Sequence, residues 1–150
     1  MPKQQSAAPM ASERKPITPE IFASLRVVSD PTISPDGKRV AYTLAEWAPG
    51  EQRRRVSVWV VSAEQTSDGR LPEPTLVAAV GKHDSQARWS PDGQWLAFLS
   101  NREEEGGFGK AQVYVAPAAG GAARRVCAMP NGAGALAWSP DSQRLAFTTL

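Results

Sequence analysis

A short stretch of sequence occurs three times in this chain and constrains its fold more than any other feature. ISPDGKRVAYT begins at Ile33, WSPDGQWLAFL at Trp89 and WSPDSQRLAFT at Trp138, so the serines that follow are spaced 56 and 49 residues apart. A period in this range, with several strands in each unit, is typical of β-propeller blades, because one unit cannot bury both faces of its sheet alone. We therefore expect an all-β chain made of stacked blades.

Each repeat is built around a Ser-Pro-Asp-Gly turn. Serine begins a β-turn, proline presets φ at about −65°, aspartate tolerates the third position and glycine accepts a positive φ at the fourth. We predict a tight hairpin that joins the first two strands of each blade. The turn residues are Ser34, Pro35, Asp36 and Gly37 in the first unit, Ser90, Pro91, Asp92 and Gly93 in the second, and Ser139, Pro140 and Asp141 in the third, where Ser142 replaces the glycine.

The strands around these turns follow from alternating or continuous apolar residues between turn signals. The third and fourth strands are predicted over Val56–Ser62 and Thr75–Ala79 in the first unit, and over Ala111–Ala116 and Ala123–Cys127 in the second. A long polar loop over Ala63–Pro74 separates the first pair, whereas Gly120 and Gly121 favour a tight turn in the second. The third unit supplies two strands, over Ala135–Ser139 and Arg144–Leu150.

This pattern predicts about two and a half four-stranded blades: about 28–80, about 84–128, and half a blade over about 134–150. Small residues should lie where a neighbouring sheet approaches closely, at Ala41, Ala97 and Ala146. A blade that ends after two strands leaves an unpaired edge and an uncovered apolar face, which native proteins avoid. We therefore expect the 150 residues to be the N-terminal piece of a longer protein.

The segment ahead of the blades divides into two parts. Residues 1–16 are polar and rich in Pro, Ala and Ser, which predicts a disordered tail without the apolar run of a secretory signal. Residues 17–27 should form a short helix over Pro19–Leu25, capped by Thr18, and then lead into the first strand. No run of apolar residues is long enough to cross a membrane, so we expect a cytoplasmic protein without a membrane partner.

Composition excludes several classes of function. The formal net charge is only +2, which gives no basis for a nucleic-acid partner. Cys127 and His83 are the only residues of their types, so neither an intrachain disulfide nor a Cys/His zinc site can form. We expect no metal and no cofactor.

The stretch from Ile17 to Leu44 resembles the start of serine peptidases of the prolyl oligopeptidase family, particularly the acylaminoacyl-peptidase branch. The resemblance covers about residues 17–150, and the VSDP segment that leads into the first repeat is its most specific part. Further similar features are WSPDG from Trp89, LAFLSNR from Leu96, and a Gly-Gly turn followed by Arg124, Arg125 and Val126.

The resemblance implies a propeller, commonly of seven blades, that covers a C-terminal α/β-hydrolase domain with a Ser-Asp-His triad. That domain would lie beyond residue 150, and no catalytic residue can be assigned in this chain, which lacks a G-x-S-x-G nucleophile elbow. Implied partners are short peptides, N-acylated, free or proline-containing, the rest of the propeller and the hydrolase domain. A homo-oligomer is a further option.

Charged residues offer a few candidate sites. Arg88 is predicted on an innermost strand, where it would either face the central channel and meet a peptide carboxylate or pair with a neighbouring blade. The Arg53–Arg55 run is predicted to be a solvated hairpin loop rather than a phosphate site. His83 and Asp84 could form a proton relay, but a solvated loop histidine is the simpler interpretation.

Two functions from different classes remain open. One is the propeller that restricts access to the active site of a serine oligopeptidase. The other is a noncatalytic propeller for protein interaction, as in the periplasmic component of the Tol system, which would call for an export signal that residues 1–16 do not contain.

Overall fold

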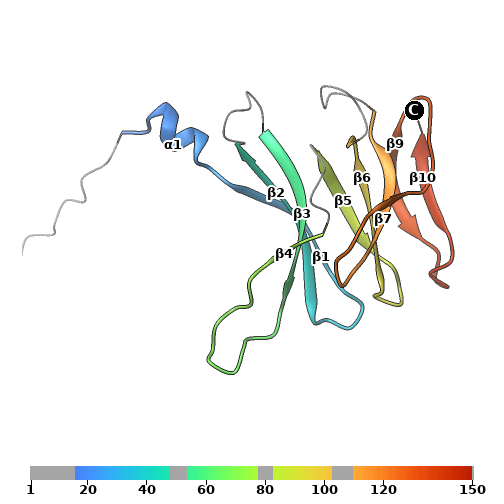
Figure 1. Ribbon diagram of the computed structural model, residues 1–150, viewed down its shortest axis with the longest axis horizontal. Coiled ribbons are helices and arrows are strands. Elements are labelled where there is room, and N and C mark those ends of the chain that lie inside the picture. The colour runs from blue at the N-terminus through green and yellow to red at the C-terminus, as the bar shows by residue number, and fades with distance from the viewer. Residues whose placement is uncertain (1–15, 48–53, 78–82, 103–109, 150) are drawn as a thin grey trace, which may run out of the picture.

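The computed structural model describes residues 16–47, 54–77, 83–102 and 110–149 (Figure 1). The predicted tail therefore lies almost entirely outside the described residues. A single short helix, α1 (Pro19–Ala23), precedes the strands in the described ranges. The strands are β1 (Val27–Ile33), β2 (Arg39–Trp47), β3 (Arg54–Ser62), β4 (Thr75–Leu76), β5 (Asp84–Trp89), β6 (Trp95–Ser100), β7 (Gln112–Pro117), β8 (Arg124–Arg125), β9 (Ala133–Trp138) and β10 (Leu145–Thr149).

These strands form two antiparallel four-stranded sheets and one two-stranded sheet. The orders are β1-β2-β3-β4, β5-β6-β7-β8 and β10-β9, so every neighbour in a sheet is also a neighbour along the chain. The sheets stand side by side, and the turns that carry the Ser-Pro-Asp repeats gather at the lower end of the view (Figure 1). The predicted all-β fold of about two and a half propeller blades is confirmed.

The third strand of the first blade begins earlier than the sequence predicted. Arg54 and Arg55 pair with Trp47 and Glu46 of β2, so they lie in β3, and the prediction of a solvated loop is wrong for these two residues. Cross-strand pairing with the long β2 extends the strand beyond its run of β-branched residues. Arg53 lies outside the described residues.

The outer strands are shorter than predicted. β4 and β8 contain two residues each, although the backbone N–H groups of Val77 and Val126 continue the ladders by donating to Val58 and Val113. Ala78 and Ala79 of the predicted fourth strand lie outside the described residues.

Other strand bounds differ from the prediction by one or two residues. In the second blade, β7 begins and ends one residue later than predicted. In the third blade, β9 begins two residues earlier than predicted and β10 begins one residue later.

Helix α1 has the predicted N-cap, with the Ile21 N–H donating to Thr18 Oγ1 over 3.4 Å. It ends at Ala23 rather than Leu25, because the Leu25 N–H bonds to the carbonyl of Phe22 in a tighter turn. None of its residues is buried. Within the described ranges, no helix has the length and apolar character needed to span a membrane.

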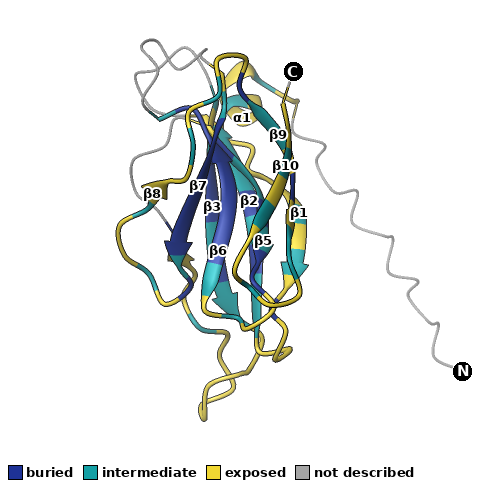
Figure 2. Ribbon diagram, turned by 90° about the vertical axis from the view of Figure 1, so that its right-hand side faces the viewer, coloured by how far each residue is buried: buried dark blue, intermediate teal, exposed yellow. Residues whose placement is uncertain are grey.

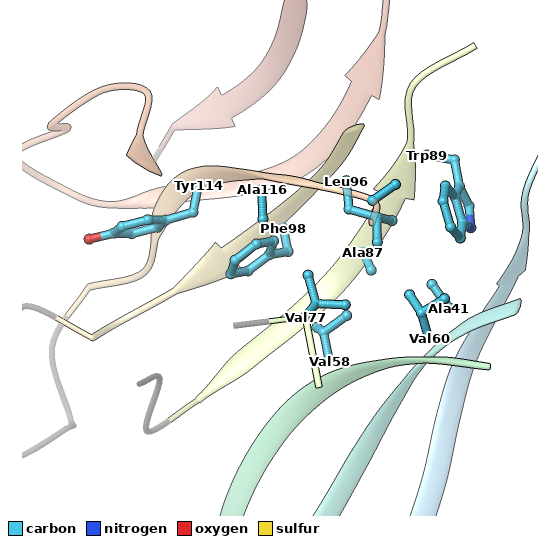
Figure 3. Close-up of a cluster of buried hydrophobic side chains, with 11 residues drawn as sticks. Ala41, Val58, Val60, Val77, Ala87, Trp89, Leu96, Phe98, Tyr114 and Ala116 are labelled. Atoms are coloured by element: carbon cyan, nitrogen blue, oxygen red, sulfur yellow. The ribbon is translucent and has the colours of Figure 1, made fainter. Parts of the chain in front are cut away.

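The core consists of two layers, each between adjacent blades. The layer between the first two blades contains Ala41, Val58, Val60, Trp89, Leu96 and Phe98, with other residues drawn in Figure 3. The layer between the second and third blades contains Ala97, Leu99, Val113, Val115 and Leu136.

Two of the three predicted small residues lie at these interfaces. Ala41 and Ala97 are both 0% exposed, so each permits close approach of the next sheet. Ala146, at the corresponding position of the third blade, is exposed. Burial is concentrated in β6 and β7 of the second blade, which has a neighbour on either face (Figure 2).

Candidate functional site

The three repeat turns share one backbone. The residue at the fourth position has a φ of 72° at Gly37, 70° at Gly93 and 59° at Ser142, and its N–H donates to the carbonyl of the first serine over 2.8–3.0 Å. The positive φ predicted for the glycines is therefore present. Ser142 adopts the same conformation without being glycine, at a cost of about 1 kcal/mol.

Hydrogen bonds within each turn fix the aspartate. In the first turn the Ser34 hydroxyl donates to Asp36 Oδ1, which also accepts the Lys38 N–H over 3.1 Å. The same pattern recurs in the other turns. The serine hydroxyl, and then the backbone N–H, hold the pKa of Asp36, Asp92 and Asp141 below the ordinary value. This network gives the repeated residues a structural role in the turn.

Two tryptophans join adjacent blades through their indole N–H groups. Trp89 donates to the carbonyl of Thr32 over 3.1 Å, and Trp138 donates to the carbonyl of Arg88 over 3.0 Å. Thr32 and Arg88 occupy the same position in their repeats, so one contact is repeated along the propeller. The first repeat has Ile33 in place of the tryptophan, and the Ile33 side chain is 67% exposed.

Arg39 connects the first blade to the second and was not found by sequence reasoning. Its guanidinium donates to the carbonyls of Gly93 over 3.0 Å and Ala118 over 3.3 Å. The guanidinium carbon also lies 4.7 Å from the centroid of the Trp89 ring. The corresponding residue is Trp95 in the second repeat and Arg144 in the third, so the repeat does not single out Arg39 for this contact.

The inner strands contain β-bulges that the sequence analysis also missed. The pairing of β1 with β2 shifts between Ser29 and Thr32, and that of β5 with β6 shifts between Ser85 and Arg88. Asp30 and Gln86, the equivalent residues of the two bulges, have positive φ values of 48° and 54°. Aspartate is tolerated in this conformation, whereas glutamine seldom adopts it.

Arg88, the predicted channel residue, pairs with Asp30 of the neighbouring blade. Arg88 Nη1 lies 3.1 Å from Asp30 Oδ2 and 3.2 Å from Oδ1, and it donates to the carbonyl of Ala87 over 2.7 Å. The two side chains are 38% and 36% exposed. The ion pair that the sequence analysis considered is therefore present, and contact with a peptide stays a prediction.

Asp84 belongs to a buried ion pair within the second blade. Its Oδ2 lies 3.1 Å from Arg102 Nη2, and the Arg102 guanidinium lies over the ring of Tyr114 at 4.5 Å. Burial raises the pKa of Asp84, although Ser100 and Arg102 oppose the shift. His83 is exposed and forms a backbone bridge with Val56. This geometry favours a structural role for Asp84 over the proton relay.

A pocket of about 370 Å³ lies between the second and third blades. Trp95, Trp138, Arg124 and Leu145 are among its lining residues. It adjoins a blade of which only two strands are described, so we assign no ligand to it. In the described part of the chain, no group of three or more His, Cys, Asp or Glu residues is arranged to hold a metal ion.

The fold and these inter-blade contacts define the chain as a segment of a β-propeller. No protein-family model matches the sequence. The chain is 32% identical, over 135 residues, to an uncharacterized peptidase of Bacillus subtilis, YuxL. The match covers 90% of this chain and 19% of that relative, so the chain spans about a fifth of the relative's length.

Solved structures with the same fold include further peptidases. The acylaminoacyl peptidase of Pyrococcus horikoshii is similar with a TM-score of 0.58 and 26% identity, covering 83% of this chain and 17% of that one. The propeller domain of the trilobed protease from Pyrococcus furiosus gives a TM-score of 0.52 at 23% identity, covering 81% of this chain and 34% of that one. A putative TolB from Agrobacterium tumefaciens gives a TM-score of 0.55 at 24% identity, covering 79% of this chain and 36% of that one. The chain is thus a propeller segment related to peptidases.

Proposed function

We propose that the chain is the N-terminal propeller segment of a serine oligopeptidase of the prolyl oligopeptidase family, similar to the acylaminoacyl peptidases. The observation that carries this proposal is the 32% identity to a peptidase over 90% of the chain. The similarity to the acylaminoacyl peptidase fold supports the finer assignment. The expected substrates are short peptides, including N-acylated ones, and the expected location is the cytoplasm.

In this proposal the propeller limits which substrates reach the active site. A closed ring of blades encloses a narrow channel, so a short peptide passes while a folded protein does not. A hydrolase domain outside these 150 residues supplies the serine nucleophile, the histidine that takes its proton, and the acid that orients the histidine. Backbone N–H groups there stabilise the oxyanion. The remaining blades and this domain are the implied intramolecular partners, and self-association is a further proposal.

The test uses the full-length protein and a fluorophosphonate probe. We expect the probe to label one serine outside residues 1–150, and labelling to abolish hydrolysis of N-acetylated and free short peptides. Native lysozyme, a stably folded protein, should be cleaved much more slowly than a short peptide. Replacement of the labelled serine by alanine is the matched control. Absence of both labelling and peptide hydrolysis would contradict the proposal.

The TolB-like interaction module is the second candidate, and the fold similarity to a putative TolB favours it. It predicts a protein without labelling or hydrolysis that is recovered with a protein partner. The same probe experiment therefore separates the two functions.

A further inference from the structure

Arg88 lies at the inner edge of its blade. β1, β5 and β9 are the first strands of their sheets, each is hydrogen-bonded on one side only, and β5 contacts both β1 and β9. In a propeller such first strands surround the central channel. Ala87 and Trp89 belong to the core layer shared with the first blade, so the alternation of side chains directs Arg88 away from that layer. Its guanidinium reaches Asp30 of β1, the first strand of the neighbouring blade.

The guanidinium is fixed through one nitrogen. Nη1 alone donates to both carboxylate oxygens of Asp30 and to the carbonyl of Ala87. Nε and Nη2 of Arg88 donate to no residue in the described part of the chain. These two nitrogens form the edge of the planar group that binds a carboxylate through two parallel hydrogen bonds. The Arg88 side chain as a whole is 38% exposed.

Asp30 is in a conformation consistent with this arrangement. Its φ of 48° belongs to the β-bulge in β1, which is repeated at Gln86 in β5 of the next blade. The bulge carries the carboxylate to Arg88 Nη1 and leaves the opposite edge uncovered. Asp30 is thus a positioning residue for Arg88.

We propose that Arg88 binds a peptide carboxylate on the channel wall through Nε and Nη2. The inference deepens the proposed function and rests on it for the nature of the ligand. Two sources share this chemistry: the free C-terminus of a peptide and an acidic side chain within it. Asp30 offsets part of the positive charge, so binding depends on the geometry of the two hydrogen bonds.

The test measures binding to the full-length protein by calorimetric titration. Three pentapeptides of matched sequence are used, each with N-methylated amides that resist hydrolysis: one with a free C-terminus, one with a C-terminal amide, and one amide with an internal glutamate. We expect Arg88→Gln to raise Kd for the free-acid peptide about tenfold or more, because charge-assisted hydrogen bonds are lost. Kd for the plain amide should change less than about twofold. If Arg88→Gln also raises Kd for the glutamate peptide, the site binds acidic side chains as well as free C-termini.

A second variant keeps the test valid if Arg88→Gln is unstable. Arg88→Lys retains the charge that faces Asp30 but lacks the two-nitrogen edge, so it should also weaken the free-acid peptide selectively. The matched control is Arg70→Gln, which removes an exposed arginine from the Ala63–Pro74 loop and should leave all three Kd values unchanged.

Failures of the two proposals are distinguishable. Equal Kd values of the wild type for the free acid and the amide, or equal losses for both peptides in the Arg88 variants, would overturn the assignment of Arg88. Selective binding by a protein that hydrolyses no unmodified peptide would leave the Arg88 assignment standing and contradict the peptidase function. Hydrolysis of unmodified peptides without selective binding of the free acid would support the peptidase function and overturn the assignment of Arg88.

Discussion

The Ser142 hydroxyl accepts a hydrogen bond from the backbone N–H of Asp92 over 3.0 Å, across the boundary between the second and third blades. The third repeat has serine where the first two have glycine. Its side chain therefore adds a contact between blades that glycine cannot make, while its backbone keeps the strained positive φ of 59°.

Replacement of Ser142 separates the hydrogen bond from the strain. Ser142→Ala loses the bond and keeps the strain, so we expect it to destabilise the full-length protein by about 0.5–1.5 kcal/mol. Ser142→Gly loses the bond but relieves about 1 kcal/mol of strain, so its stability should stay close to that of the wild type. Urea denaturation measures both values. A glycine variant no more stable than the alanine variant would contradict this balance.

Gly93 and Gly37 provide a matched pair of turn positions. Both have a φ near 70°, but a Cβ on Gly93 would lie 3.7 Å from Pro35 Cδ and 3.9 Å from Arg39 Nη2, whereas a Cβ on Gly37 would meet no atom within 4 Å. Gly37→Val should cost about 1–2 kcal/mol of backbone strain. Gly93→Val should cost more, because its methyl groups also crowd the contact between blades. Melting temperatures of the two variants provide the comparison, and equal losses would show that the inter-blade contact is unimportant.

The sequence predicted those features that depend on local chemistry. The repeat spacing and the Ser-Pro-Asp-Gly turns were sufficient for the blade architecture, and alanine at positions 41 and 97 marked the close sheet contacts. Turn conformation is set within five residues, so each copy of the repeat carries its own signal.

Long-range contacts and backbone irregularities were not predictable in this way. Arg39 binds carbonyls 54 and 79 residues away, and the equivalent residue of the second repeat is Trp95, although the third repeat has Arg144. The bulge at Gln86 places a residue without any left-handed preference at positive φ, because the pairing of β5 with β6 imposes it. Arg88 was selected from its predicted strand, but only the structure shows which edge of its guanidinium is occupied.

Arg39 should contribute to the stability of the interface between the first two blades. Arg39→Met keeps the apolar stem and removes two hydrogen bonds and the contact with the Trp89 ring, so we expect a loss of about 2–3 kcal/mol. Lys38→Met is the control, because Lys38 is exposed and forms a surface ion pair with Glu64. Chemical denaturation of the full-length protein should show a loss for Arg39→Met alone. A comparable loss in both variants would contradict the role assigned to Arg39.

The turn aspartates should make the fold sensitive to acid. Hydrogen bonds from Ser90 and from the Gln94 N–H hold the pKa of Asp92 below its ordinary value, and Asp36 and Asp141 are shifted in the same direction. A lowered pKa in the folded state means that the unfolded state binds protons more tightly, so stability falls as the pH falls. The contribution is fully present above the unfolded-state pKa of about 3.9 and is lost through the lower folded-state values.

Asp92→Asn tests this origin of the acid sensitivity, because asparagine keeps an oxygen acceptor but cannot titrate. The variant should be less stable than the wild type at about pH 7, since a neutral acceptor binds the Ser90 hydroxyl and the Gln94 N–H more weakly. The difference should shrink as the pH falls below about 4, where the wild-type carboxyl becomes protonated first in the unfolded state and, at lower pH, in the folded state. Urea midpoints across this range, with the exposed Glu73→Gln as control, provide the measurement. A difference between Asp92→Asn and the wild type that stays constant from pH 7 down to the acid limb would show that the turn carboxylate does not drive the pH dependence.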